Sequence, residues 1–290
     1  MPLVRPVVRA QSDRQCGSHW ICRGGGEIGS NGAGRALIGA QGGEMADQQE
    51  YAYSKQRAAS LLLSFVAGYV DSCTFLALFG LFVAQVTGSF VVAGAQIARS
   101  GQGLLVTTFA IPMFVIAGAA TTLLVAFAKQ RRSSPLVWSL ALEGALLTGF
   151  LVLGLIGSPF QGPNAALAVI AGLLGLSAMG VQSALVQLLM PGAPSTNVMT
   201  TNTTQLAVLA TTTALRLRMG RPDDRAAFPF ASASDRLASV LTVAIGFLLG
   251  TVAGAVGYSI VDLWCLLAPI SIIVGLLICA VWSSPIAQER

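Results

Sequence analysis

Charged residues are scarce in this sequence, and their scarcity indicates its class. Only 10% of its 290 residues are Asp, Glu, Lys or Arg, whereas soluble domains usually carry about 25%. Hydrophobic residues make up 54% of the chain, and the mean hydropathy is +0.72. The composition therefore predicts an all-α integral membrane protein and excludes an ordinary soluble domain.

Histidine is almost absent, since His19 is the only one. A single histidine excludes His-based catalytic dyads, and with Cys16 and Cys22 it supplies too few ligands for a metal ion. The five cysteines form no disulfide framework. The sequence also lacks a Gly-x-Ser-x-Gly elbow, a phosphate-binding loop and a paired-aspartate signature. We therefore expect no enzyme, no metal and no cofactor.

The net charge of +5 is small, and most basic residues lie beside apolar segments. This placement indicates membrane topology rather than a surface for nucleic acid. The expected partners are the lipid bilayer and a small solute, with no nucleic acid among them.

Six apolar segments are long enough to cross a bilayer core of about 30 Å, which needs about 20 helical residues. They are residues 60–80, 104–127, 136–156, 164–189, 237–258 and 263–282. Two further segments, 82–98 and 196–215, are shorter, more polar, and rich in Thr, Gly or Gln. The number of spans is six or eight, depending on whether these two cross.

The basic clusters favour six spans. If the two polar segments do not cross, the clusters within 55–57, 129–132 and 216–225 all fall on the cytoplasmic side, as the positive-inside rule requires. If both cross, the cluster at 129–132 moves outside. We therefore expect six spans with both termini in the cytoplasm.

The first 44 residues are glycine-rich and lack the apolar core of a signal peptide, so residues 1–44 are expected to be a disordered tail. The abrupt change in composition leads to the hypothesis that translation begins at Met45. The rest divides into a cytoplasmic leader (45–58), a first membrane repeat (59–157), a second membrane repeat (158–284) and a C-terminal tail (285–290).

The two halves share a plan. The stretch Val70-Asp71-Ser72 corresponds to Val181-Gln182-Ser183, and residues 86–89 correspond to residues 199–202. In each half, one span precedes the polar segment and two spans follow it, so each half has three spans. Because three is odd, the second half must enter the membrane inverted. Inverted repeats with interrupted segments at matching positions indicate the binding site of a transporter.

Each polar segment breaks an apolar run with groups that need hydrogen bonds. We expect a short extended or re-entrant stretch followed by a half-helix. Thr87 or Ser89 would cap the first half-helix, with Gly88 allowing a turn. Pro191 and Pro194 would end the helix before the second half-helix, which would begin near Thr200 or Thr201. Free N–H groups at both helix starts would favour an anion or a polar solute. The alternative is two kinked spans whose polar side chains bond neighbouring helices.

Asp71 lies midway along the first expected span, and no residue within a helical turn can neutralise it. A carboxylate at the bilayer centre costs at least about 2.5–3.5 kcal/mol, so such residues usually line a cavity, pair or carry protons. Glu143, in the third span, is a second candidate for ion coupling; it could pair with Asp71 or Arg99, or reach the interface instead.

These stretches resemble the YoaK-type family of bacterial multi-span membrane proteins. The resemblance rests on a Gly-x-x-Asp element at 68–71, a Phe-Val-Ala-x-x-Thr-Gly element at 82–88, a Met-Gly-x-Gln element at 179–182 and a Thr-rich element at 198–202. It extends over residues 58–283. It implies a bacterial inner-membrane protein with about six spans, and it supplies no substrate.

Two positions depart from the family pattern. Ser89 stands where the family has Asn, and Thr201 stands where Gly is expected. A ligand-binding role for an amide at position 89 is therefore weakened.

The leading hypothesis is a small secondary transporter or exporter, proton-coupled through Asp71 or Glu143. The expected substrate-binding residues lie in and around the interrupted segments: Asp71, Gln85, Thr87, Gly88, Ser89, Gln182, Thr200 and Asn202. The contrasting hypothesis is a non-transporting scaffold or regulator whose polar residues only hold the bundle together. A homodimer is compatible with so small a bundle.

Overall fold

The computed structural model describes residues 32–99, 104–219 and 233–283. The chain divides into two compact units, Met1–Gln48 and Gln49–Arg290, and the features described below belong to the second unit. Residues 1–31 of the expected disordered tail lie outside the described residues, and residues 32–44 form the beginning of the first helix.

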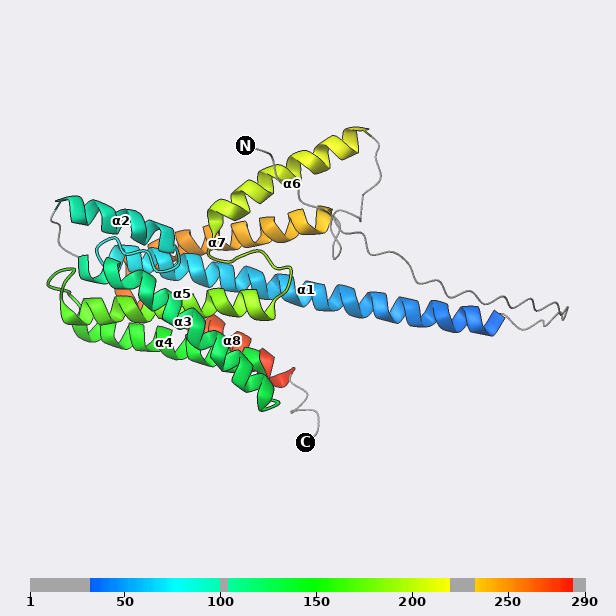
Figure 1. Ribbon diagram of the computed structural model, residues 1–290, viewed down its shortest axis with the longest axis horizontal. Helices are drawn as coiled ribbons and strands as arrows, with labels where there is room; N and C mark the ends of the chain where they lie inside the picture. The colour runs from blue at the N-terminus through cyan, green and yellow to red at the C-terminus, as the bar shows by residue number, and fades with distance from the viewer. Residues whose placement is uncertain (1–31, 100–103, 220–232, 284–290) are drawn as a thin grey trace, which may run out of the picture. The chain divides into compact units, whose positions relative to one another are not determined.

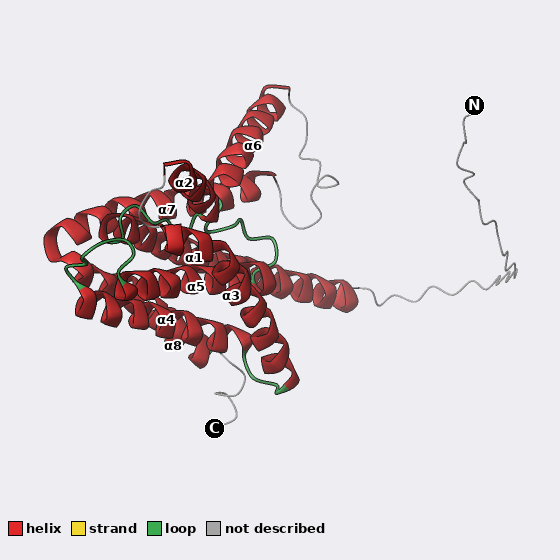
Figure 2. Ribbon diagram, turned by 60° about the vertical axis from the view of Figure 1, so that its left-hand side comes forward, coloured by secondary structure: helices red, strands yellow, loops and turns green. Residues whose placement is uncertain are grey.

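The described residues form helices joined by loops and contain no strand (Figures 1 and 2). The helices are α1 (Gly32–Ala77), α2 (Val86–Arg99), α3 (Leu104–Gln130), α4 (Pro135–Gly157), α5 (Ala166–Leu189), α6 (Met199–Met219), α7 (Ala233–Val261), the 3₁₀-helix η2 (Asp262–Leu266) and α8 (Leu267–Trp282). This confirms the expected all-helical class.

Proline explains two of these boundaries. α4 begins at Pro135, where a missing N–H is no loss because the first turn has no intrahelical acceptor for it. α5 ends at Leu189, two residues before Pro191, whose ring disfavours helical geometry at Met190. The expectation that proline ends this helix is confirmed.

Within the described residues, five segments are long and apolar enough to cross a membrane. They are Tyr53–Ala77, Thr108–Gln130, Pro135–Gly157, Ala166–Leu189 and Ser234–Trp282. The last includes α7, η2 and α8. Neither α2 nor α6 is among them, in line with the expectation that these two segments do not cross. The first segment begins earlier than the expected 60–80, so Asp71 lies six residues before its end, about 9 Å along the helix axis, and not midway.

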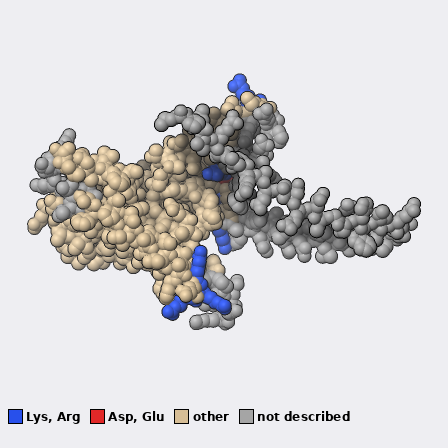
Figure 3. Space-filling view, viewed as in Figure 1, with Lys and Arg blue, Asp and Glu red and all other residues tan. Residues whose placement is uncertain are grey.

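The outer faces of these helices are apolar. Large hydrophobic side chains are well exposed, among them Val91, Ile116, Leu123, Leu248 and Ile260. In the view of Figure 3, the described surface is almost free of charged side chains, and Lys and Arg lie at its margins. A surface of this kind is stable in lipid and costly in water. The protein is therefore membrane-embedded.

α1 and α7 pack backbone to backbone. A methyl group added at Gly246, Gly250 or Gly254 of α7 would overlap a carbonyl oxygen of α1, and one added at Gly68 would overlap a carbonyl oxygen of α7. Ser64 donates a hydrogen bond of 2.6 Å across the same contact to the carbonyl of Val243. The glycines recur every four residues, which is the spacing that lets membrane helices approach closely.

α3 and α5 form a second close pair. A methyl group at Gly180 of α5 would lie 2.9 Å from the Ala117 side chain of α3 and 3.1 Å from the carbonyl oxygen of Phe114. α4 packs against α3, α5 and α8, while α2 packs on α3 and α6 on α7. α2 and α6 thus each pack on the long helix that follows in sequence.

Candidate functional site

The chain leaves α1 through a tight turn. Phe79 and Gly80 both adopt left-handed backbone conformations, with φ of 54° and 85°. The N–H of Gly80 bonds the carbonyl of Phe75 at 2.9 Å, which closes the last turn of the helix. Glycine adopts this conformation without strain. The chain then turns back along α1 in a non-helical segment, residues 81–85.

Asp71 holds this returning segment. Its Oδ1 accepts hydrogen bonds from the backbone N–H groups of Val83 and Ala84, each 2.8 Å long. The side chain is 4% exposed, and both donors are buried. α2 begins at Val86, two residues after the second donor. The carboxyl of one helix therefore satisfies the free N–H groups that lead into the next.

The first turn of α2 differs from the expectation that a local hydroxyl caps it. Since α2 begins at Val86, Thr87, Gly88 and Ser89 lie inside the helix. Ser89 is buried and donates a 3.0 Å hydrogen bond to the carbonyl of Phe82, whereas Thr87 is exposed. Gly88 has no left-handed conformation; a methyl group there would lie 2.9 Å from the Phe82 ring. Its role is close packing and not a turn.

Gln182 holds the second non-helical segment, residues 190–198, in a comparable way. Its side chain is fully buried, and Nε2 lies 2.8 Å from the carbonyl oxygen of Leu63, 3.1 Å from Oγ1 of Thr196 and 3.4 Å from Oδ1 of Asn197. The Asn197 amide in turn donates a 2.8 Å bond to Oγ of Ser183. This network joins α5, the segment after it and α1.

α6 begins at Met199, one or two residues before the expected start near Thr200 or Thr201. Asn202, in its first turn, is buried and donates a 2.6 Å hydrogen bond to the carbonyl of Ser195. Thr200 is exposed. The amide nitrogen of Asn202 is therefore occupied within the protein, and Thr200 is not part of the buried network.

The two junctions, which are the non-helical segments 78–85 and 190–198 with the helix starts that follow them, share a spacing. Ser89 and Asn202 each bond a carbonyl seven residues earlier. Ser89 and Asn202 are 113 positions apart in the sequence. The first residues of α2 and α6, Val86 and Met199, are separated by the same number of positions. A buried polar side chain of the preceding helix holds each segment, Asp71 in the first and Gln182 in the second.

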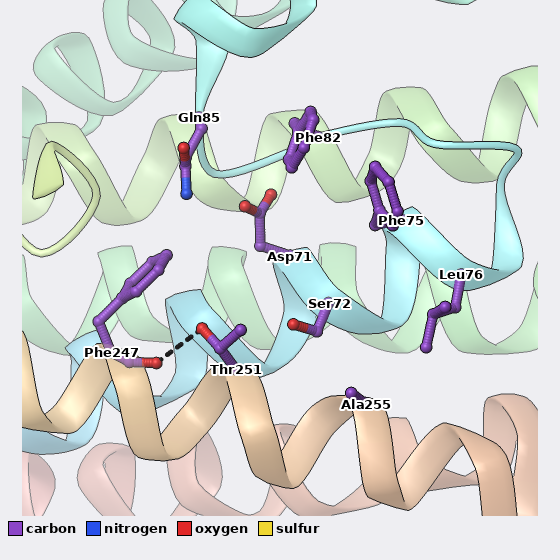
Figure 4. Close-up of a pocket in the computed structure, with 9 residues that line it drawn as sticks. All are labelled: Asp71, Ser72, Phe75, Leu76, Phe82, Gln85, Phe247, Thr251 and Ala255. Atoms are coloured by element: carbon purple, nitrogen blue, oxygen red, sulfur yellow. Dashed lines mark hydrogen bonds between the residues drawn. The ribbon is translucent and has the colours of Figure 1, made fainter. Parts of the chain in front are cut away.

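A pocket of about 300 Å³ lies beside the first junction (Figure 4). We call it the α1–α7 pocket, because α1, the segment 81–85 and α7 line it. Asp71 and Gln85 point toward one another at its upper side, and Phe247 and Thr251 approach from α7. Of the expected site residues, the structure brings these first two together in one cavity.

A second pocket of about 380 Å³ lies beside the second junction. Asn202 lines it, together with Gln187, Thr201, Gln205 and, from α7, Arg236. The two pockets share no lining residue. Among the expected site residues, Thr87, Gly88, Ser89, Gln182 and Thr200 line neither of them.

The contributions of α7 to both pockets were not foreseen from the sequence. Phe247, Thr251 and Arg236 are separated from the junctions by long stretches of chain. Phe247 and Thr251 lie in the apolar run 237–258, and no pattern in the sequence identified its neighbour.

Glu143 of α4 is fully buried, and in the described part of the chain neither of its carboxyl oxygens has a hydrogen-bond partner. It therefore makes no hydrogen bond with Asp71. The expected alternative, Arg99, has a side chain outside the described residues. A buried carboxyl without a partner is costly for stability.

Cys73 of α1 and Cys265 of η2 are buried thiols whose sulfur atoms lie 3.0 Å apart. No pattern in the sequence indicated this pair. No group of three or more His, Cys, Asp or Glu side chains that could hold a metal ion occurs among the described residues.

The outer faces of the helices are apolar, and buried polar side chains hold two loop segments inside the protein. These features define a polytopic α-helical membrane protein. A more specific assignment comes from comparison with protein families. The model of a family described as "Protein of unknown function (DUF1275)" matches residues 59–280. The chain belongs to this family, which includes the YoaK-type proteins that it was expected to resemble. No curated protein and no solved structure is significantly similar to it.

Proposed function

We propose that this protein is a secondary transporter of a small solute in the bacterial inner membrane. The pair of non-helical segments, 78–85 and 190–198, carries the proposal. Each follows an apolar helix, is held by a buried side chain of that helix, and leads into a helix outside the candidate spans. Irregular backbone at membrane depth requires cover by protein or water. Broken helices at matching positions are common where transporters bind solute.

In this proposal, α1–α4 and α5–α8 are two inverted repeats. The matched junctions support it, and so does the packing, because α1 packs on α7 as α5 packs on α3. Counting α7 and α8 as separate spans gives six, with α2 and α6 as helices that do not cross. Three spans per repeat put both termini in the cytoplasm.

Each repeat would then contribute one pocket beside its own junction. Asp71 is the candidate for proton or cation coupling in the first repeat, since its counterpart Gln182 has no charge. Glu143 is a second candidate, because its carboxyl is buried without a partner in the described chain. Gln85 supplies polar atoms for a solute in the α1–α7 pocket, and Asn202 supplies them in the second pocket.

A scaffold is the second candidate function, and one observation favours it. Both hydrogen bonds of Asp71 go to backbone groups, so a structural role already accounts for this buried carboxyl. In either case we propose that the protein has no enzymatic activity and needs no cofactor, and that it can form a homodimer.

The test is a thermal-shift screen of the purified full chain against metabolites and drugs at two pH values, followed by uptake measurements in proteoliposomes. A ligand specific for the native state stabilises by about 2.7 kcal/mol at 100 times its Kd. A transporter should give a saturable hit that is taken up, and Gln85→Ala should weaken it. Thr87→Ala, two residues away and exposed, is the matched control.

Loss of uptake in Asp71→Asn, with the fold and stability retained, would support coupling through this charge. If a well-folded sample binds no ligand and moves no solute, the transporter proposal fails and the scaffold remains.

A further inference from the structure

The α1–α7 pocket has a composition that the second pocket lacks. Asp71 is its only charged lining residue, and three of the remaining eight are phenylalanines: Phe75, Phe82 and Phe247. The second pocket is lined by no carboxylate and by no aromatic ring, and its only charged side chain is that of Arg236. The two junctions match in backbone, but their pockets are suited to different ligands.

The carboxyl of Asp71 is only partly compensated. Oδ1 accepts the N–H groups of Val83 and Ala84, which contribute partial positive charge. No Lys or Arg lines the pocket. A carboxylate in a water-poor site is strongly stabilised by a cation. The pocket therefore presents a negative group that a bound cation would neutralise.

The aromatic lining favours an organic cation over a metal ion. The rings of Phe75 and Phe82 lie 4.9 Å apart between centroids, at an interplanar angle of 41°, and Figure 4 shows them on α1 and the returning segment, opposite α7. Ring faces attract ammonium groups, most strongly where water is excluded. A hard metal ion needs several oxygen ligands, and Asp71 is the only carboxylate that lines this pocket.

The volume fits a small ligand. A cavity of about 300 Å³ lies at the lower end of the range of small-molecule sites, which is roughly 300–1,000 Å³. Ser72 and Gln85 add polar atoms that can accept or donate one or two further hydrogen bonds.

We propose that the α1–α7 pocket binds a small organic monocation, an amine or quaternary ammonium compound, with its charged group between Asp71 and the phenylalanine rings. The cation would be the substrate class of the transporter proposed above. Its transport rests on that proposal, whereas its binding in the pocket does not. Asp71 is then a binding residue as well as the group that holds the segment 81–85.

The test is isothermal titration of the full chain in detergent with two cations and their neutral counterparts. Choline is compared with 3,3-dimethylbutan-1-ol, and benzylamine with benzyl alcohol. We expect each cation to bind at least tenfold more tightly than its neutral counterpart. Asp71→Asn, which keeps an Oδ1 acceptor for the two N–H groups, should remove this difference.

Phe75→Leu provides a second variant that does not disturb the hydrogen bonds of the junction. It should weaken both cations several-fold. The control is Gln205→Ala in the second pocket, which should leave their affinities unchanged. Equal affinity for cation and neutral counterpart, competition by NaCl at the same concentration as choline, or unaltered choline binding in Asp71→Asn would each overturn the proposal.

The two proposals fail in different ways. Choline or benzylamine bound at this pocket but not taken up into proteoliposomes would remove the transporter and leave the cation site. Saturable uptake of a neutral or anionic solute by a protein that binds neither cation would remove the cation site and leave the transporter.

Discussion

The strongest prediction concerns the two hydrogen bonds that Asp71 makes to the returning segment. Asp71→Ala removes the acceptor of the N–H groups of Val83 and Ala84, which are 0% and 3% exposed. Each buried donor without a partner costs about 1–3 kcal/mol, so the gross loss is about 2–6 kcal/mol. Removing the buried carboxyl returns part of this. We expect a net destabilisation of at least about 2 kcal/mol.

Asp71→Asn should behave differently. Its amide oxygen can take the place of Oδ1 and accept both N–H groups, although without the charge that strengthens these bonds. We expect a loss of about 1 kcal/mol or less. Asp262→Asn is the control, because Asp262 is exposed and its left-handed conformation is one that Asn also tolerates.

The assay is denaturant unfolding of the full chain in detergent, together with hydrogen exchange on peptides covering residues 81–90. In Asp71→Ala the amides of Val83 and Ala84 should exchange faster, because local opening no longer breaks a hydrogen bond. An alanine variant as stable as the parent protein, or an asparagine variant as unstable as the alanine one, would refute this account of the junction.

Three further substitutions follow from the same structure. Glu143→Leu should raise the free energy of unfolding by about 1–3 kcal/mol, because it removes a buried carboxyl without a partner; a lower unfolding free energy would mean that the carboxyl has a partner in the membrane. Asn202→Ala should lower the unfolding free energy by about 1–2 kcal/mol, since the carbonyl of Ser195 loses its donor; an unchanged value would argue against that bond. Gly250→Ala should disrupt the helix contact, as its methyl group overlaps the carbonyl of α1, whereas Gly275→Ala meets no neighbouring atom; equal melting temperatures for these two variants would contradict the close packing.

Much of the helical layout could be predicted from the sequence, because it depends on local properties. Apolar runs of about 20 residues predicted the long helices, and Pro191 marked the end of α5. The polar breaks predicted that α2 and α6 are separate helices. In each case the signal lies within the segment that it describes.

The junctions were harder to predict, because their hydrogen bonds come from other elements. The local rule placed the start of the first short helix at Thr87 or Ser89, whereas α2 begins at Val86. The reason is that Asp71, on α1, accepts the N–H groups just before α2. The start of α2 therefore depends on a residue of another helix, which a local capping rule does not include.

The pockets could be predicted only in part for a similar reason. Asp71 and Gln85 drew attention as polar residues in apolar surroundings, and both line the α1–α7 pocket. Phe247 looked like an ordinary apolar residue of a span. Its place beside Asp71 depends on the contact between α1 and α7, and no local pattern reveals which helices are neighbours.

The contact between α1 and α7 also sets the order in which the protein can be assembled during synthesis. Ser64 and Val243, which bond across it, are 179 positions apart. At about 5–20 residues per second, the ribosome needs roughly 10–40 s to make the chain between them. For that time the face of α1 that later packs against the glycines of α7 must be covered by lipid or by the insertion machinery. The first helix to enter the membrane is therefore completed by one of the last.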